Sequence, residues 1–83
     1  MMNWTSESFG YCLRDGDGRA RGTIVRHTDG FWGQVINANM PDSGPYKSRH
    51  EAAGWVVGML ILWGLVPKGT AFGKFPFDKR DAA

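Results

Sequence analysis

Acidic side chains are the first residues of this 83-residue chain that could do chemistry, by binding a metal ion. Asp15-Gly16-Asp17-Gly18 opens like a calcium loop, but Arg26 stands at the twelfth position, where such a loop needs a bidentate glutamate. Asp and Gly in this order are also typical of a tight turn. We therefore interpret the segment as a turn and expect no bound metal.

Cysteine and histidine offer a second route to catalysis. Cys12 is the single cysteine, and His27 and His50 are the two histidines. Neither histidine stands beside both a nucleophile and an orienting carboxylate, as covalent or acid–base catalysis requires. A single cysteine in an alternating strand is most often a small core residue. We therefore expect a protein that is not an enzyme and that uses no cofactor.

Arginine gives the strongest local charge bias of the chain. Six residues could form a surface that binds a partner or nucleic acid: Arg14, Arg19, Arg21, Arg26, Trp32 and Tyr46. Guanidinium groups contact phosphates, and aromatic rings stack on bases. Alternatively, the arginines keep an apolar hairpin in solution, and the acidic residues of the 15–18 turn dilute their charge. We favour this second interpretation and keep nucleic-acid binding as an alternative.

Length and composition limit the chain to one small domain. With 42% hydrophobic and 22% charged residues, 83 residues can form a compact apolar core. The net charge of +2 permits partners that are acidic proteins or nucleic acids. A single cysteine excludes an intramolecular disulfide, and the N-terminus has no basic start followed by an apolar run. We expect the protein to reside in a reducing cytoplasm.

The stretch from Ser48 to Pro67 organises the fold. Ser48 and Glu51 have the spacing of a capping box, and residues 52–66 carry no charge. Pro67 cannot continue a helix, because it lacks the backbone N–H. These features predict one apolar helix that ends before Pro67. A helix that is apolar all round must be covered on more than one side.

Helical spacing divides this stretch into two faces. The face predicted to pack on a sheet contains Trp55, Val56, Met59, Leu60 and Trp63. The opposite face is a candidate helix-packing or dimer surface and contains Gly54, Gly58, Ile61 and Leu65. Glycines four residues apart let a second helix approach closely. Cover for this face could come from a second copy of the chain or from the tail residues Phe72, Phe75 and Phe77.

A membrane span is a second interpretation of the same stretch. The 15 uncharged residues 52–66 would form a helix of about 22 Å, against a hydrocarbon thickness of about 30 Å. This shortfall favours a buried helix over a span. We therefore expect no membrane partner and keep a short membrane protein as the second alternative.

Three strands are predicted before the helix, at residues 9–14, 19–28 and 31–37. Asp29-Gly30 is typical of a hairpin turn that joins the second strand to the third. Either the Trp32 side or the Phe31 side of the third strand could face inward. The order of elements predicts an α+β fold in which a three-stranded antiparallel sheet packs against one C-terminal helix, followed by an irregular aromatic tail. Residues 1–8 are predicted to be a polar leader, 9–77 a single compact domain and 78–83 a frayed C-terminus.

The segment Tyr46–Ala53 follows these strands and resembles the opening of the helix in integrase arm-type DNA-binding modules. The resemblance covers residues 9–63 and implies a three-stranded sheet with one helix. It also implies that one face of the sheet enters the major groove of DNA. By position, it implicates Arg19, Arg21, Arg26 and Trp32 in contacts to DNA.

Small size, the missing catalytic set and the missing export signal together favour a binding protein. Our specific hypothesis is an inhibitor of a host protein complex, of the kind that phage and mobile elements encode, with anti-CRISPR proteins as one such class. The first alternative is a nucleic-acid-binding module that uses the arginine-rich hairpin. We expect a protein partner, and the glycine side of the helix also makes a homodimer an option.

Overall fold

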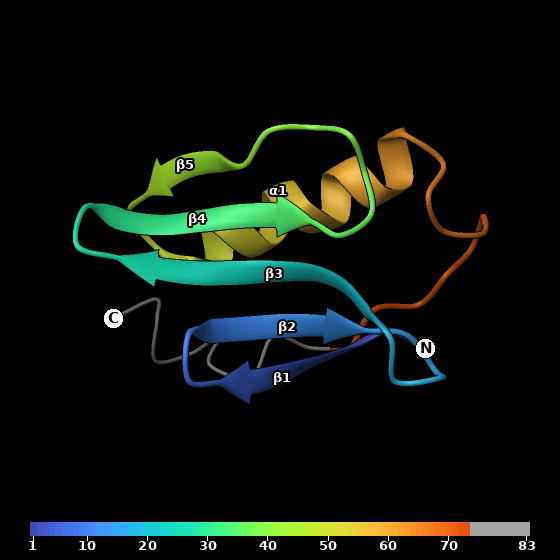
Figure 1. Cartoon of the computed structure of the whole chain (residues 1–83). Coiled ribbons are helices and arrows are strands. Elements are labelled where there is room, and N and C mark those ends of the chain that lie inside the picture. The colour runs from blue at the N-terminus through green and yellow to red at the C-terminus, as the bar shows by residue number, and fades with distance from the viewer. Residues whose placement is uncertain (74–83) are drawn as a thin grey trace.

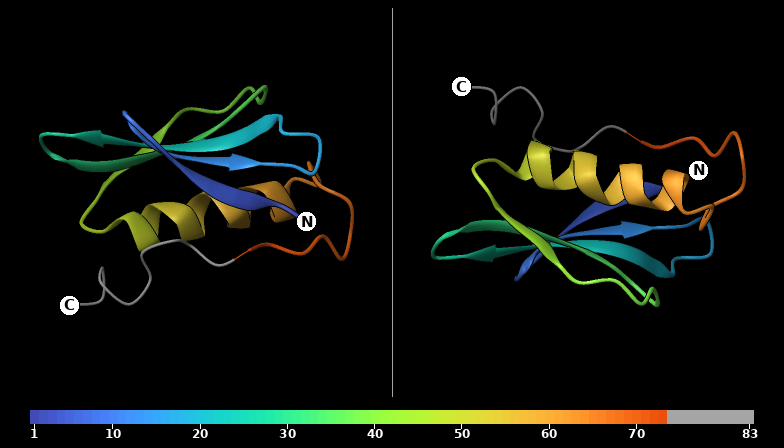
Figure 2. Two further views of the ribbon diagram at one scale, coloured as in Figure 1. Left: turned by 90° about the horizontal axis from the view of Figure 1, so that it is seen from below. Right: turned by 90° about the horizontal axis from the view of Figure 1, so that it is seen from above.

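The computed structural model describes residues 1–73, so the predictions for Phe75, Phe77 and the C-terminal residues 78–83 lie outside the described residues. The elements in chain order are β1 (Asn3–Glu7), β2 (Gly10–Arg14), β3 (Ala20–His27), β4 (Gly30–Val35), β5 (Ser43–Tyr46) and α1 (Arg49–Leu62). One helix lies against one face of a single antiparallel sheet (Figures 1 and 2). The predicted α+β class is confirmed.

The sheet has five strands, so the predicted number of three is wrong. Its order is β1-β2-β3-β4-β5, and each neighbouring pair is antiparallel. β1 lies where a polar leader was predicted, and β5 lies between the third predicted strand and the helix, where no strand was predicted. Both are edge strands that contribute one large side chain each to the helix-facing side, Trp4 and Tyr46. A strand with a single inward apolar residue has no period-two pattern, so its backbone pairing cannot be read from the sequence.

Glycines determine which face of the sheet receives α1. A Cβ atom at Gly33 in β4 would lie 2.7 Å from Cε3 of Trp55 and 3.3 Å from the carbonyl oxygen of Ala52. A Cβ atom at Gly22 in β3 would clash with the side chain of Val56. Both glycines therefore permit a close approach of the helix to the sheet. The inward face of β4 is the one that carries Phe31 and Gly33.

The core lies between this glycine-containing face and α1. Its fully buried large side chains are Leu13, Ile24, Val56 and Leu60. Cys12 in β2 is also buried, but its register partners Thr5 and Thr23 place it on the other face of the sheet. Trp55 and Met59 pack at the border of the core, as the predicted docking face requires. Trp63 is 65% exposed, so its assignment to that face is wrong. It occupies the C-cap position, where the helical backbone has already ended.

The two ends of α1 show where the helix begins and why it ends before Trp63. At the N-terminus, the hydroxyl oxygen of Ser48 accepts a hydrogen bond from the backbone N–H of Glu51 at 3.2 Å, which confirms the predicted cap. At the C-terminus, Gly64 adopts a φ of +64°, and the N–H of Leu65 donates to the carbonyl oxygen of Leu60 at 2.9 Å. This geometry is a Schellman motif, and it stops the helix before Pro67. None of the described residues form a helix with both the length and the hydropathy to cross a membrane.

Candidate protein-binding surface

Arg14 and Arg19 lie at the β2–β3 turn, but in different environments. Arg14 forms an ion pair with Glu7 at 3.4 Å and donates to the carbonyl oxygen of Gly18 at 3.0 Å. The side chain of Arg19 is exposed. Arg26 is also exposed, but seven residues of extended chain, about 23 Å, separate it from Arg19. The sequence-predicted arginine surface is therefore divided between the two ends of β3.

Arg21 holds the end of the helix to the sheet. Its Nη2 atom donates to the carbonyl oxygen of Leu65 at 2.6 Å, and its Nη1 atom lies 3.7 Å from Oδ2 of Asp15. Both contacts are partly buried. Arg21 thus connects β3, the β2–β3 turn and the residue that follows the helix stop. Its guanidinium group therefore stabilises the fold through both contacts.

Trp32 and Tyr46 belong to opposite faces of the sheet. The indole N–H of Trp32 donates to Oδ1 of Asp29 at 3.0 Å, and its ring lies edge-on to His27 with a centroid distance of 6.3 Å. Tyr46 pairs with Phe31 on the helix-facing side, and its hydroxyl group is 2.6 Å from Oγ of Ser43. The structure does not bring these two aromatic rings together.

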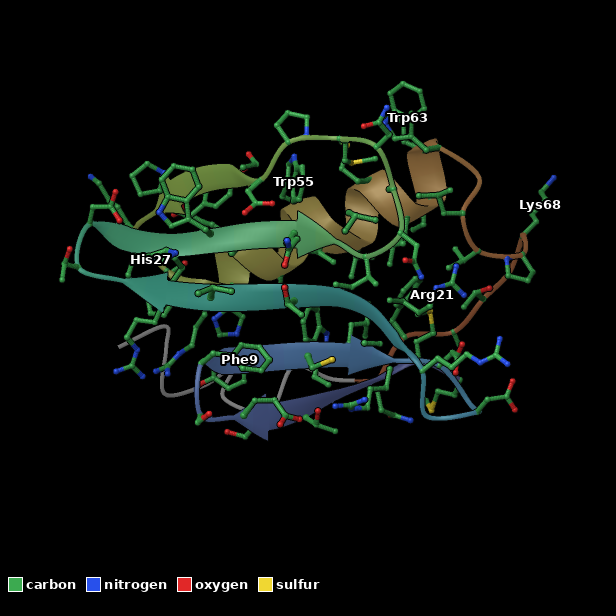
Figure 3. The ribbon with its side chains drawn as sticks, in the orientation of Figure 1. Phe9, Arg21, His27, Trp55, Trp63 and Lys68 are labelled. Carbon is green, nitrogen blue, oxygen red and sulfur yellow. The ribbon has the colours of Figure 1, made fainter. Side chains whose placement is uncertain are left out.

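The last two residues of α1 and the C-cap residue that follows them are three adjacent, large apolar residues with exposed side chains. Ile61, Leu62 and Trp63 are 58%, 73% and 65% exposed, whereas the neighbouring Leu60 is 1% exposed. We call these three consecutive residues the α1 apolar surface. Figure 3 shows Trp63 projecting from the end of the helix. Adjacent exposed apolar residues of this size are typical of an interaction site.

A cavity lies on each side of the α1 apolar surface. The first, of about 300 Å³, lies between Ile61 and the segment 66–72. The second, of about 290 Å³, lies between Trp63 and the loop 37–40. Phe72 lines the first cavity and Met40 the second, so each has an apolar wall. The α1 apolar surface is therefore a ridge between two hollows, a shape that can interlock with protruding side chains of a partner.

Two glycines extend this surface along the outside of α1. Gly54 and Gly58 are exposed, and among the described residues nothing beyond the adjacent backbone of α1 itself lies within 4 Å of a Cβ atom built on either. They form a continuous outer face with Ile61, as the sequence predicted. Leu65, the fourth predicted member, instead packs partly buried against the core. Three of the four predicted residues therefore share one surface.

The sequence did not identify Leu62 and Trp63 as members of a binding surface. Leu62 belonged to neither predicted face, and Trp63 was assigned to the docking face. The signal that could have identified both residues is Gly64, which directly follows them and can end a helix in the left-handed conformation.

Three titratable groups of the described residues have pKa values shifted by their surroundings in the fold. Burial raises the pKa of the Cys12 thiol, which disfavours the nucleophilic thiolate. The hydrogen bond from Thr5 is the main cause that lowers the pKa of Glu7, with Arg14 assisting. The backbone N–H of Arg19 is the main cause that lowers the pKa of Asp15. Within residues 1–73, no three His, Cys, Asp or Glu side chains are grouped as metal ligands.

Acid should destabilise the protein through the β2–β3 turn. The folded state holds the pKa of Asp15 below its ordinary value of 3.8, so this contribution to stability is present above pH 3.8 and is lost as the pH falls through the lower, folded value. Asp15→Asn should therefore show a smaller drop in melting temperature between pH 7 and pH 3 than the parent protein. Thermal unfolding followed by circular dichroism measures both drops.

The matched control for this test is Asp17→Asn in the same turn. Asp17 supports the turn with its backbone N–H, which donates to Oδ1 of Asp15 at 2.9 Å and survives the substitution. This variant should keep the parental acid sensitivity. An equal drop in melting temperature for the parent and Asp15→Asn would contradict the assignment of this acid sensitivity to Asp15.

Comparison with known proteins identified no relative of this chain. The chain matches no protein-family model, and searches of curated proteins and of solved structures found no match either.

Proposed function

We propose that the chain is a non-enzymatic protein-binding module that binds its partner through the α1 apolar surface. The observation that carries this proposal is the exposure of Ile61, Leu62 and Trp63, at 58–73%, beside a fully buried Leu60. Complete burial of one such side chain contributes about 1.5–3 kcal/mol. Three of them in one turn can supply the apolar centre of an interface, where affinity is concentrated.

The distribution of basic groups favours a protein over nucleic acid as the partner. Arg14 and Arg21 are held in ion pairs and hydrogen bonds within the fold. Arg19 and Arg26 are exposed but far apart, so they do not follow a phosphate backbone as a ribbon. The cavities at the end of α1 have walls that include Phe72 and Met40. Such walls suit apolar side chains.

The finer form of the proposal is an inhibitor of a host protein complex, as anti-CRISPR proteins are. It rests on small size and on the absence of a recognisable catalytic set in the sequence. We place the protein in a reducing cytoplasm, in keeping with a single cysteine that is buried. Both statements remain predictions.

Leu62→Ser combined with Trp63→Ser should abolish capture of a partner. The full chain is immobilised and exposed to nuclease-treated lysate of the cell that produces it, and bound proteins are quantified by mass spectrometry. Loss of about 3 kcal/mol of apolar burial would reduce affinity by about 100-fold. The proteins captured by the parent chain should therefore be missing from the double variant.

Phe9→Ser is the control for this experiment. Phe9 is 42% exposed at the β1–β2 turn, so the change also removes an exposed apolar side chain but leaves the end of α1 intact. Figure 3 shows Phe9 well away from Trp63. Capture that survives the double variant, or capture that occurs only in lysate without nuclease and is lost with Arg19→Ala, would overturn the proposal.

A further inference from the structure

We propose that the hollow between Trp63 and the loop 37–40 is a subsite for a tyrosine side chain of the partner protein. The hollow has a volume of about 290 Å³. This volume is close to the lower limit of the roughly 300–1,000 Å³ that ligand sites occupy, so it suits one aromatic side chain and not a large ligand. The inference rests on the proposed function, because it names the side chain that the partner places beside the α1 apolar surface.

Apolar side chains from two separate segments form the walls of this hollow. Trp63 and Leu65 come from the end of α1 and the residues after it, whereas Ala38 and Met40 come from the loop after β4. An indole ring pairs favourably with a second aromatic ring, and a thioether sulfur makes favourable contacts with the edge of such a ring. An aromatic ring placed here can therefore contact an indole from one wall and a thioether from the other.

Two side-chain amides supply the hydrogen-bonding groups of this hollow. Asn37 and Asn39 line it, and both residues are exposed. Among residues 1–73, no hydrogen bond uses either of these side-chain amides. Each amide offers a carbonyl acceptor and an NH₂ donor, and a phenolic hydroxyl group can both donate and accept. A tyrosine side chain can thus bond to an amide with its hydroxyl group while its ring contacts the apolar walls.

Charge decides which class of ligand fits. The described residues that line this hollow are all uncharged, whereas Lys68 lines the hollow on the other side of the α1 apolar surface. A charged side chain or a phosphate group would lose hydration here without gaining a counter-charge. Phenylalanine is neutral but would cover the amides without bonding to them. Tyrosine is neutral, has a polar tip and is enriched among the residues that dominate binding at interfaces.

Arg21 in β3 holds the two walls of the hollow in place. Its carbonyl oxygen accepts a hydrogen bond from the backbone N–H of Ile36 at 3.1 Å, where the loop begins. Its guanidinium group donates to the carbonyl oxygen of Leu65 at 2.6 Å, after the end of α1. Asn37 then turns the loop with a φ of +59°, a left-handed conformation in which asparagine is enriched. Because one residue fixes both walls, the hollow is preorganised, which lowers the cost of binding.

The test is an NMR titration of the full chain with N-acetyl-tyrosine amide, a neutral probe that carries the proposed side chain. The methyl signal of Met40 should shift, with a dissociation constant of about 1 mM. N-acetyl-phenylalanine amide lacks the hydroxyl group and should bind about fivefold more weakly. Adenosine, as the probe for a nucleobase, should bind more weakly than the tyrosine probe. Absence of binding, equal binding of the two amino-acid probes, or tighter binding of adenosine would overturn the proposal.

Asn37→Gly combined with Asn39→Ala should remove the preference for the tyrosine probe. Glycine tolerates the left-handed conformation at residue 37, so the loop should keep its course. Affinity for the tyrosine probe should fall about fivefold, to that of the phenylalanine probe, whose own affinity should not change. Damage to the fold would instead weaken both probes. A preference for tyrosine that persists in this variant would overturn the role of the amides and the proposal with it.

Trp63→Ser tests the aromatic wall of the hollow. It should weaken the binding of both amino-acid probes about tenfold, because it removes the indole ring that their rings contact. Trp63 is 65% exposed, so the variant should remain folded. Phe9→Ser, which removes an exposed ring at the β1–β2 turn, is the matched control and should bind both probes as the parent does. Equal binding by these two variants would overturn the proposal.

The two proposals fail separately. Lysate capture that depends on Leu62 and Trp63, together with a parent protein that does not bind the tyrosine probe, overturns the tyrosine subsite and supports the proposed function. Binding of the tyrosine probe, together with capture that survives the double variant, supports a tyrosine-binding hollow and overturns the proposed function. Absence of both probe binding and capture overturns both proposals.

Discussion

Gly33→Val should lower the free energy of unfolding by about 3 kcal/mol. The new Cβ atom would lie 2.7 Å from Cε3 of Trp55, 3.1 Å from Cγ2 of Val56 and 3.3 Å from the carbonyl oxygen of Ala52. The last contact is with backbone, so relief requires movement of α1 away from β4. Valine favours strands over glycine by less than this loss, on a scale that spans about 1 kcal/mol. Urea unfolding at constant protein concentration measures the change.

Gly54→Ala is the control for a substitution at a glycine. It also adds a Cβ atom, but on the open side of α1, where nothing in the described residues lies within 4 Å. The better helix propensity of alanine should raise the free energy of unfolding by about 1 kcal/mol. An unchanged urea midpoint for Gly33→Val would show that α1 does not lie this close to the sheet.

Leu60→Ala should also lower the free energy of unfolding by about 3 kcal/mol. Leu60 is 1% exposed and packs with Leu13, Val35 and Val56 in the core. Truncation removes buried methyl groups and leaves a cavity that a helix fixed at both ends can only partly close. The same urea experiment reports the loss as a lower midpoint with an unchanged slope.

Leu62→Ala is the matched control, two residues further along the same helix. Leu62 is 73% exposed, so the same chemical change should alter the free energy of unfolding by about 0.5 kcal/mol or less. Leu60 thus serves the fold, and Leu62 is available to a partner. Equal losses for the two variants would contradict this division of the last turn of α1.

The candidate site could be predicted from the sequence in part. Gly54, Gly58 and Ile61 were identified by their spacing, because residues three and four apart share one side of any helix. Leu62 and Trp63 were not identified, because their exposure depends on which tertiary contacts the end of the helix makes. The grouping of Arg14, Arg19, Arg21 and Arg26 was based on closeness in sequence alone. Sequence spacing does not show that Arg21 reaches Leu65, 44 residues away.

Local chemistry determined part of the fold without tertiary contacts. Ser48 and Glu51 specify the start of α1, because the cap is formed by atoms three residues apart. Asp29-Gly30 specifies the hairpin between β3 and β4, because Gly30 adopts a positive φ of 140° where the turn enters β4. These signals sufficed for an α+β fold with one helix on an antiparallel sheet.

Tertiary packing alone decided the remaining features. Spacing separated the two faces of α1 correctly along most of its length, but tertiary packing decided that Trp63 is exposed and that Leu65 packs against the core. The inward face of β4 was decided by the match of Gly22 and Gly33 to the surface of the helix. β1 and β5 are strands because their backbones complete hydrogen bonds at the edges of the sheet. Few side chains in these two strands indicate that pairing in the sequence. Capping and turn signals are contained within a few residues, whereas burial and edge pairing depend on segments far apart in the chain.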